Sequence, residues 1–184
     1  VVLDVKDLTV VAHGGKEIVN HVNFKIHAGE ILGIAGVEGN GQAELLDALL
    51  GIEKSTGTVK FVEQDISNWS TRKRRESGIA YIPEDRQRQA LLLDAPLWEN
   101  RMLGHQTLPP NSKGFWLTPR AAKADTTRIV SEYDVRTPSI DVYASALSGG
   151  NQQKLIVGRE MSGEPKLLIA AHPTRGVDVG AQAA

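Results

Sequence analysis

Hydrophobic and polar positions alternate at the start of the chain and give way to continuous apolar runs later. Residues 3–10 and 19–26 alternate apolar with polar side chains, which predicts two strands that each bury one face. Residues 31–35 are continuously apolar, and such a run predicts a strand buried on both faces in a parallel sheet. Shorter strands are predicted over residues 57–62 and 79–82. The first half of the chain is therefore expected to be rich in strands.

Helical periodicity appears in fewer places. Residues 45–50 predict a helix that Gly51 caps, and residues 118–133 predict a second helix. Between residues 91 and 146 the pattern is helical but looser, which indicates an inserted helical subdomain. Residues 166–170, which are apolar after Lys166, predict a last buried strand, followed by a polar turn. Strands interleaved with helices favour an α/β fold with a mostly parallel sheet.

Composition limits the function classes. The chain has 184 residues with a net charge of -1, so overall charge gives no case for nucleic acid or an anionic membrane as a direct partner. It has no cysteine, which excludes disulfides and thiolate metal sites. The basic run at residues 71–76 is interpreted as the solvated face of a short helix rather than a nucleic-acid patch, because no aromatic ladder accompanies it.

A glycine-rich segment connects the apolar run at 31–35 to the helix predicted at 45–50. Strand, glycine loop and helix form the context of a phosphate-binding loop, and Gly36 and Gly41 have its spacing, G-x-x-x-x-G. Backbone amides of such a loop can cradle phosphates whatever the side chains are. The candidate nucleotide-binding residues are Gly36, Gly39, Asn40, Gly41, Gln42, Ala43 and Glu44. The alternative is a glycine turn that only closes a βα unit.

The usual side-chain chemistry of a phosphate loop is missing here. Gln42 stands where a lysine reaches the β- and γ-phosphates, and Ala43 stands where a Ser or Thr hydroxyl holds Mg²⁺. Weak nucleotide binding and poor transition-state stabilisation are therefore expected at this loop.

A second glycine motif lies at residues 147–154, Leu-Ser-Gly-Gly-Asn-Gln-Gln-Lys. An uninterrupted apolar and basic run follows it, so a helix is predicted to begin at Ser148. The free amides and partial positive charge of a helix start suit a phosphate. The alternative is a serine-capped helix after an ordinary turn.

The strand predicted at 166–170 ends without carboxylates. At this position phosphate-loop ATPases hold Mg²⁺ with a carboxylate, and a neighbouring residue orients the attacking water. Here the two positions carry Ala171 and His172. His172 could act as a base, because its ordinary pKa lies near neutrality, or it could be a polar space-filling replacement.

Taken in order, these motifs resemble those of an ATP-binding cassette (ABC) ATPase domain. The segments G-V-E-G-N-G-Q-A-E-L, Y-I-P-E-D-R and L-L-I-A-A-H-P-T-R-G-V-D-V-G-A further resemble the second, degenerate cassette of fused double-cassette ATPases, which energise bacterial importers of simple sugars and nucleosides. The lysine-free loop and the I-A-A strand end look closest to the nucleoside branch. The resemblance runs from about Val2 to the last residue.

The resemblance implies a fold and a set of domain limits. It implies a P-loop NTPase-type sheet core with an N-terminal antiparallel β subdomain and an inserted helical subdomain. The expected division of the single domain, residues 1–184, is 1–90 for the β subdomain and Walker A core, 91–146 for the helical subdomain, and 147–184 for the signature helix, Walker B strand and D-loop. The family's switch histidine would follow Ala184, so the chain is expected to be a C-terminally truncated fragment.

The resemblance also implies roles for residues outside the glycine loop. Glu84 stands at the Q-loop position, which senses Mg²⁺ and the transmembrane subunit, and Asp178 matches the D-loop aspartate. His172 falls at the position of the catalytic glutamate, and Ala171 at that of the Walker B aspartate, so the domain is expected to hold no metal of its own. The signature residues, which bind the γ-phosphate of ATP held by the opposite cassette, are Leu147, Ser148, Gly149, Gly150, Asn151 and Gln152.

The resulting hypothesis is that this domain completes an ATP site of a partner cassette with its signature motif, while its own ATP site is weak. The cofactors are ATP and Mg²⁺, with Mg²⁺ weak or absent at this domain's own site. The partners are a second cassette, fused in the same polypeptide and packed head to tail, and transmembrane permease subunits that hold the domain at the cytoplasmic face of the membrane. The alternatives are a self-sufficient ATPase with His172 as base, and a regulatory or nucleic-acid-linked ABC protein without a membrane partner.

Overall fold

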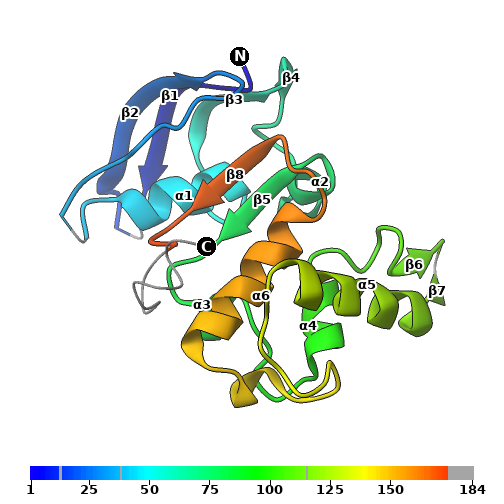
Figure 1. Ribbon diagram of the computed structural model, residues 1–184. Helices are drawn as coiled ribbons and strands as arrows, with labels where there is room; N and C mark the ends of the chain where they lie inside the picture. Colours follow the sequence, from blue (N-terminus) through cyan, green and yellow to red (C-terminus); the bar gives the residue numbers. More distant parts are fainter. Residues whose placement is uncertain (13, 38, 115, 174–184) are drawn as a thin grey trace. The chain divides into compact units, whose positions relative to one another are not determined.

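The computed structural model describes residues 1–12, 14–37, 39–114 and 116–173 (Figure 1). The chain forms two compact units, Val1–Ser77 and Gly78–Ala184. The first unit contains an antiparallel sheet, and the second contains a parallel strand pair with most of the helices.

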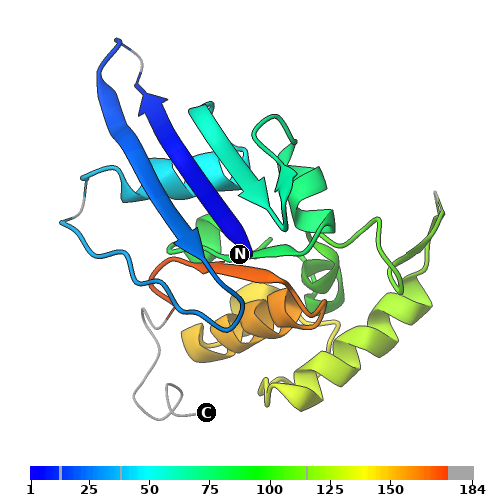
Figure 2. The same cartoon turned by 90° about the horizontal axis from the view of Figure 1, so that it is seen from above.

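The sheet of the first unit has the strand order β2-β1-β3-β4 (Figure 2). β1 pairs antiparallel with both β2 and β3. The strands are β1 (Leu3–Val11), β2 (Glu17–Ile26), β3 (Thr56–Phe61) and β4 (Gln64–Asp65). The strands predicted at 3–10, 19–26 and 57–62 are confirmed within one or two residues, and β1 buries Leu3, Val5, Leu8 and Val10.

Two helices complete this unit, α1 (Gln42–Leu50) and α2 (Thr71–Glu76). α1 buries Leu45, Leu49 and Leu50, and it ends as predicted at Gly51, whose φ of 74° is a conformation that favours glycine. The basic run at 71–76 forms the short helix predicted, with Arg72 and Lys73 exposed, but Arg74 is 2% exposed and does not belong to a solvated face. Its guanidinium donates hydrogen bonds to carbonyls at the end of α1, where a cation is favoured.

The strand predicted at residues 31–35 does not form. Residues 27–37 and 39–41 contain no helix or strand, and Ile31 and Ile34 are 97% and 50% exposed. A strand needs a neighbouring backbone to complete its hydrogen-bond ladder, and no described strand pairs with this segment. Continuous hydrophobicity alone therefore misled the prediction.

The second unit is organised around the parallel pair β5 (Ile79–Ile82) and β8 (Leu167–Ala170), which are paired from Ile79↔Leu167 to Ile82↔Ala170. β5 ends directly before Pro83, as predicted. β8 is not buried on both faces: Leu167 and Ile169 are buried, whereas Leu168 is 39% exposed. The remaining elements are α3 (Arg86–Gln89), α4 (Leu97–Met102), β6 (Ser112–Lys113), β7 (Trp116–Leu117), α5 (Pro119–Glu132), a 3-10 turn (Ala144–Ala146) and α6 (Gly149–Met161).

Helices α4, α5 and α6 pack together in this unit (Figure 1). The helix predicted at 118–133 is confirmed as α5, with Pro119 in its first turn, where its missing amide proton costs nothing. Gly158 on α6 lies so close to α5 that an added Cβ would be 2.6 Å from Ile129 Cγ2. Among the helices of the described residues, none is long and apolar enough to cross a bilayer.

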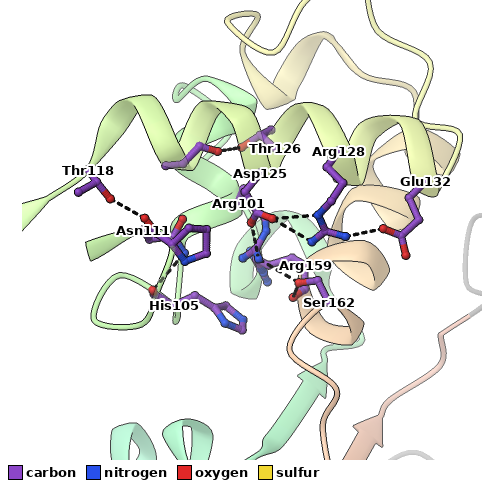
Figure 3. Close-up of polar contacts among 12 residues, drawn as sticks. Arg101, His105, Asn111, Thr118, Asp125, Thr126, Arg128, Glu132, Arg159 and Ser162 are labelled. Carbon is purple, nitrogen blue, oxygen red and sulfur yellow. Dashed lines mark hydrogen bonds and ion pairs between the residues drawn. The ribbon is translucent and has the colours of Figure 1, made fainter. Parts of the chain in front are cut away.

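A charged network in this unit, buried at Arg101 and Asp125, joins the three helices (Figure 3). Arg101 on α4 pairs with Asp125 on α5 at 2.7 Å and donates to the Ser162 hydroxyl at 2.9 Å, just after α6. Burial lowers the pKa of Arg101, and the charge of Asp125 opposes that shift. Arg128 also pairs with Asp125, at 2.8 Å. These pairs fix the register of α4, α5 and the end of α6.

Candidate functional site

The start of α6 is capped by Ser148, as predicted. The Ser148 hydroxyl accepts hydrogen bonds from the backbone amide of Asn151 at 3.4 Å and from its side-chain amide at 2.9 Å. The Asn151 side-chain oxygen in turn accepts from the Arg136 amide at 2.8 Å. Leu147 is buried among Leu155 and Ile156, so it anchors the motif rather than facing a ligand. The cap therefore holds the glycines at the helix start in a fixed position.

The two glycines after Ser148 leave the helix start open. Ser148 is exposed, and an added Cβ at Gly150 would meet no atom within 4 Å. The first amides of a helix have no intrahelical acceptor, and the Ser148 hydroxyl satisfies only that of Asn151. The Gly149 and Gly150 amides, together with the helix dipole, form a surface that an anion such as a phosphate can approach closely.

The glycine loop of the first unit leads directly into α1. Gly41 is the N-cap residue, with φ of 93°, and it has no side chain with which to cap the helix. Gly39 has φ of 86°, so both glycines take left-handed conformations that other residues rarely adopt. The loop geometry thus depends on the glycines that the sequence pattern singled out.

The side chain of Gln42 folds back over this loop. Its amide Nε2 donates to the Val37 carbonyl at 3.1 Å. An added Cβ at Gly36 would lie 2.0 Å from the same Nε2, so the Gln42 amide rests directly on Gly36. Ala43, the next residue, is exposed and has no side-chain oxygen for a cation. The loop therefore holds a neutral amide in place of the lysine and hydroxyl that bind phosphate and Mg²⁺.

The carboxyl ends of β5 and β8 share one edge of the second unit, because the two strands are parallel. Glu84 follows β5 and is exposed, and Ala171 and His172 follow β8. The Ala171 amide donates to the Ile82 carbonyl at 2.9 Å, which extends the ladder to this turn. His172 is exposed, with φ of 48°, and the methyl side chain of Ala171 cannot ligate a metal. Asp178 lies outside the described residues.

The structure shows contacts of two residues of the 147–154 motif, Gln153 and Lys154, to which the sequence pattern assigned no role. Gln153 is 7% exposed and donates to the Pro173 carbonyl at 2.7 Å. Lys154 pairs with Asp134 at 2.9 Å, and the hydrogen bond from Lys154 lowers the pKa of Asp134. Pro173 and Asp134, which these side chains contact, are both 20 residues away in sequence. The sequence near Gln153 and Lys154 therefore could not predict these contacts.

These features define a class of nucleotide-binding protein. A glycine loop that starts one helix, and a serine-capped Leu-Ser-Gly-Gly helix beside a parallel strand pair, are the parts of an ATP-binding cassette. The chain belongs to the ABC transporter family, whose sequence profile matches residues 19–175.

Curated relatives match nearly the whole chain. It is 46% identical over 181 residues to the guanosine import ATP-binding protein NupO of Bacillus subtilis (strain 168), covering 98% of this chain and 36% of that protein. It is 42% identical over 182 residues to the nucleoside import ATP-binding protein NupA of Lactococcus lactis subsp. cremoris (strain MG1363), again covering 98% and 36%. The chain thus spans about a third of the length of these relatives.

Solved structures confirm the α/β cassette fold. The dimeric ATP-binding cassette MJ0796 in a post-hydrolysis state with ADP and Pi has a TM-score of 0.81 and 19% identity, with 98% of this chain and 78% of that chain covered. The cassette MJ1267 has a TM-score of 0.77 and 22% identity, with 99% and 73% covered. The predicted antiparallel β subdomain belongs to this fold.

Proposed function

We propose that this chain is the ATP-binding domain of an importer for simple sugars or nucleosides, and that it completes an ATP site built mainly by a partner cassette. The relatives named as import ATP-binding proteins support the transport role. The partner cassette would be fused in the same polypeptide, and transmembrane permease subunits would hold the pair at the cytoplasmic face of the membrane.

One observation carries the asymmetric part of the proposal: the helix start after Ser148 is open to an anion, whereas Gln42 covers the chain's own glycine loop. At Gly150 an added Cβ would meet no atom within 4 Å, so its amide has no bulk beside it. Gln42 rests on Gly36 and brings no charge. Phosphate therefore fits the signature side better than the loop side.

The two groups that the family implies fit this chain differently. ATP held by a partner would meet the Ser148 hydroxyl and the Gly149 and Gly150 amides at its γ-phosphate, where they stabilise negative charge. Mg²⁺ prefers carboxylate and hydroxyl oxygens, and Ala43 and Ala171 offer neither. The chain's own site would thus contribute little to hydrolysis, with Asp178 coupling the two sites.

Two substitutions in the full-length protein test this proposal. Ser148→Arg places a long cation at the open helix start and removes the cap, and it should abolish ATP turnover. Gln42→Ala removes only a neutral amide and should leave turnover nearly unchanged. The reverse pattern would show that the chain's own loop is the working site, as a self-sufficient ATPase with His172 as base requires.

Calorimetric titration with ATP, with and without Mg²⁺, directly tests whether this domain's own nucleotide site binds weakly. Weak binding that Mg²⁺ does not strengthen supports the proposal. Tight, Mg²⁺-dependent binding with phosphate release by this domain alone would contradict it. Co-purification with a membrane permease would separate a transport subunit from a regulatory ABC protein.

A further inference from the structure

Two neighbouring glutamines in the first turns of α6 are buried although the helix start is open. Gln152 is 2% exposed and Gln153 is 7% exposed. Glutamine side chains are seldom fully buried unless their amides have partners. Buried in this way, neither amide can reach a ligand at Ser148, so another role must account for them.

Gln152 connects the helix to the segment after β5. Its Nε2 donates to the Ala144 carbonyl at 3.0 Å, which fixes the orientation of the amide. Its Oε1 then faces two donors, Gln87 Nε2 at 3.3 Å and Arg86 Nε at 3.4 Å. Both donors begin α3, two and three residues after Glu84. These two hydrogen bonds join α6 to the first residues of α3.

Gln153 connects the same helix to the turn after β8. Its Nε2 donates to the Pro173 carbonyl at 2.7 Å, directly after His172. Consecutive helical residues point about 100° apart, since a turn takes about 3.6 residues, so adjacent glutamines can reach two different loops. The backbone N–H of Gln152 also donates to the Ser148 carbonyl at 2.9 Å. The backbone of Gln152 is therefore bonded directly to the residue that caps the helix.

We infer that Gln152 and Gln153 are positioning residues. Through them, the segments that follow β5 and β8 determine the position of Ser148. This inference rests on the proposed function. The segment after Glu84 would move the signature helix through the side chain of Gln152, and the turn at His172 would do so through that of Gln153. Neither glutamine would contact the nucleotide. Gln152, expected from the family pattern to be among the γ-phosphate ligands, is thereby assigned a supporting role.

The test uses the full-length ATPase assembled with its permease, with Gln152→Met and Gln153→Met as variants of nearly the same shape. Each should lower kcat for ATP at least about tenfold while KM changes by less than about twofold, because misplacement of a group by about 1 Å affects mainly the transition state. Exposed Gln106→Met is the matched control and should match the unmodified protein.

A conservative change separates the two contacts of Gln152. Gln152→Glu keeps acceptors for Arg86 and Gln87 but loses the donor to Ala144, so it should retain more kcat than Gln152→Met. Gln153→Glu loses the donor that Gln153 offers to the Pro173 carbonyl, so this variant should be no better than Gln153→Met. The opposite order at either position would overturn the inference.

Gln87→Met covers the case in which the buried variants fold poorly, since Gln87 is exposed. It should lower kcat in the same direction, and Gln87→Met with Gln152→Met should be no worse than Gln152→Met alone. Additive losses, or a raised KM with unchanged kcat, would overturn the inference.

Ser148→Arg separates failure of the inference from failure of the proposed function. If Ser148→Arg abolishes turnover while both Met variants behave like Gln106→Met, the proposed function stands and the positioning role is wrong. If Ser148→Arg retains turnover, the proposed function is wrong, and the inference fails with it.

Discussion

Replacing Gly158 with alanine tests whether the signature helix is held as closely to α5 as the structure indicates. The added Cβ would lie 2.6 Å from Ile129 Cγ2 and 2.9 Å from Tyr133 Cδ2, both closer than real Cβ atoms approach. Ile129 is 0% exposed, so its side chain cannot turn into solvent. The contact can be relieved only if α5 and α6 separate.

The expected cost combines two opposing effects. Overpacking of a well-packed core costs about 1–3 kcal/mol. Alanine favours the helix over glycine by about 1 kcal/mol, which offsets part of that cost. Two atoms clash and one of them is fully buried, so the overpacking cost is expected at about 2–3 kcal/mol, which leaves a net destabilisation of about 1–2 kcal/mol.

Urea unfolding measures this difference. With a slope of about 2 kcal/mol per molar, the midpoint should fall by about 0.5–1 M without a change of slope. Gly150→Ala is the matched control, because nothing lies within 4 Å of its added Cβ; stability should hold or rise by up to about 1 kcal/mol. A midpoint for Gly158→Ala equal to or above that of the unmodified chain would refute the close contact.

Two further substitutions examine the first unit. Arg74→Met should lower the free energy of unfolding by about 2–6 kcal/mol, measured by urea unfolding, because two carbonyls at the end of α1 lose charge-assisted donors worth about 1–3 kcal/mol each. Exposed Arg72→Met should change it by less than about 1 kcal/mol. Equal effects of the two substitutions would contradict the buried role of Arg74. The hydrogen bond from His21 to Asp7 raises the pKa of His21 above its ordinary 6.5, so its contribution to stability is present below that pH and lost as pH rises through the raised value. In an NMR titration Asp7→Asn should bring this pKa back toward 6.5, and an unchanged value would exclude Asp7 as the cause.

The sequence alone determined the features that depend on neighbours along the chain. Gly51 ends α1 because a left-handed residue satisfies the last carbonyls of its own helix, and Ser148 caps α6 through Asn151, three residues ahead. The absence of lysine, hydroxyl and carboxylates at Gln42, Ala43 and Ala171 is likewise a property of residue identity. These local rules were sufficient to predict the cassette motifs and most helices and strands.

Only the tertiary structure decided which of these residues face a ligand and which support the fold. Gln152 and Gln153 look alike in sequence, yet their amides join the helix to backbone far along the chain. Residues 31–35 have the hydrophobicity of a strand but no described partner, and Gln42 turns inward onto Gly36. Hydrogen bonds between distant segments form only after the chain has packed, so local periodicity cannot predict them.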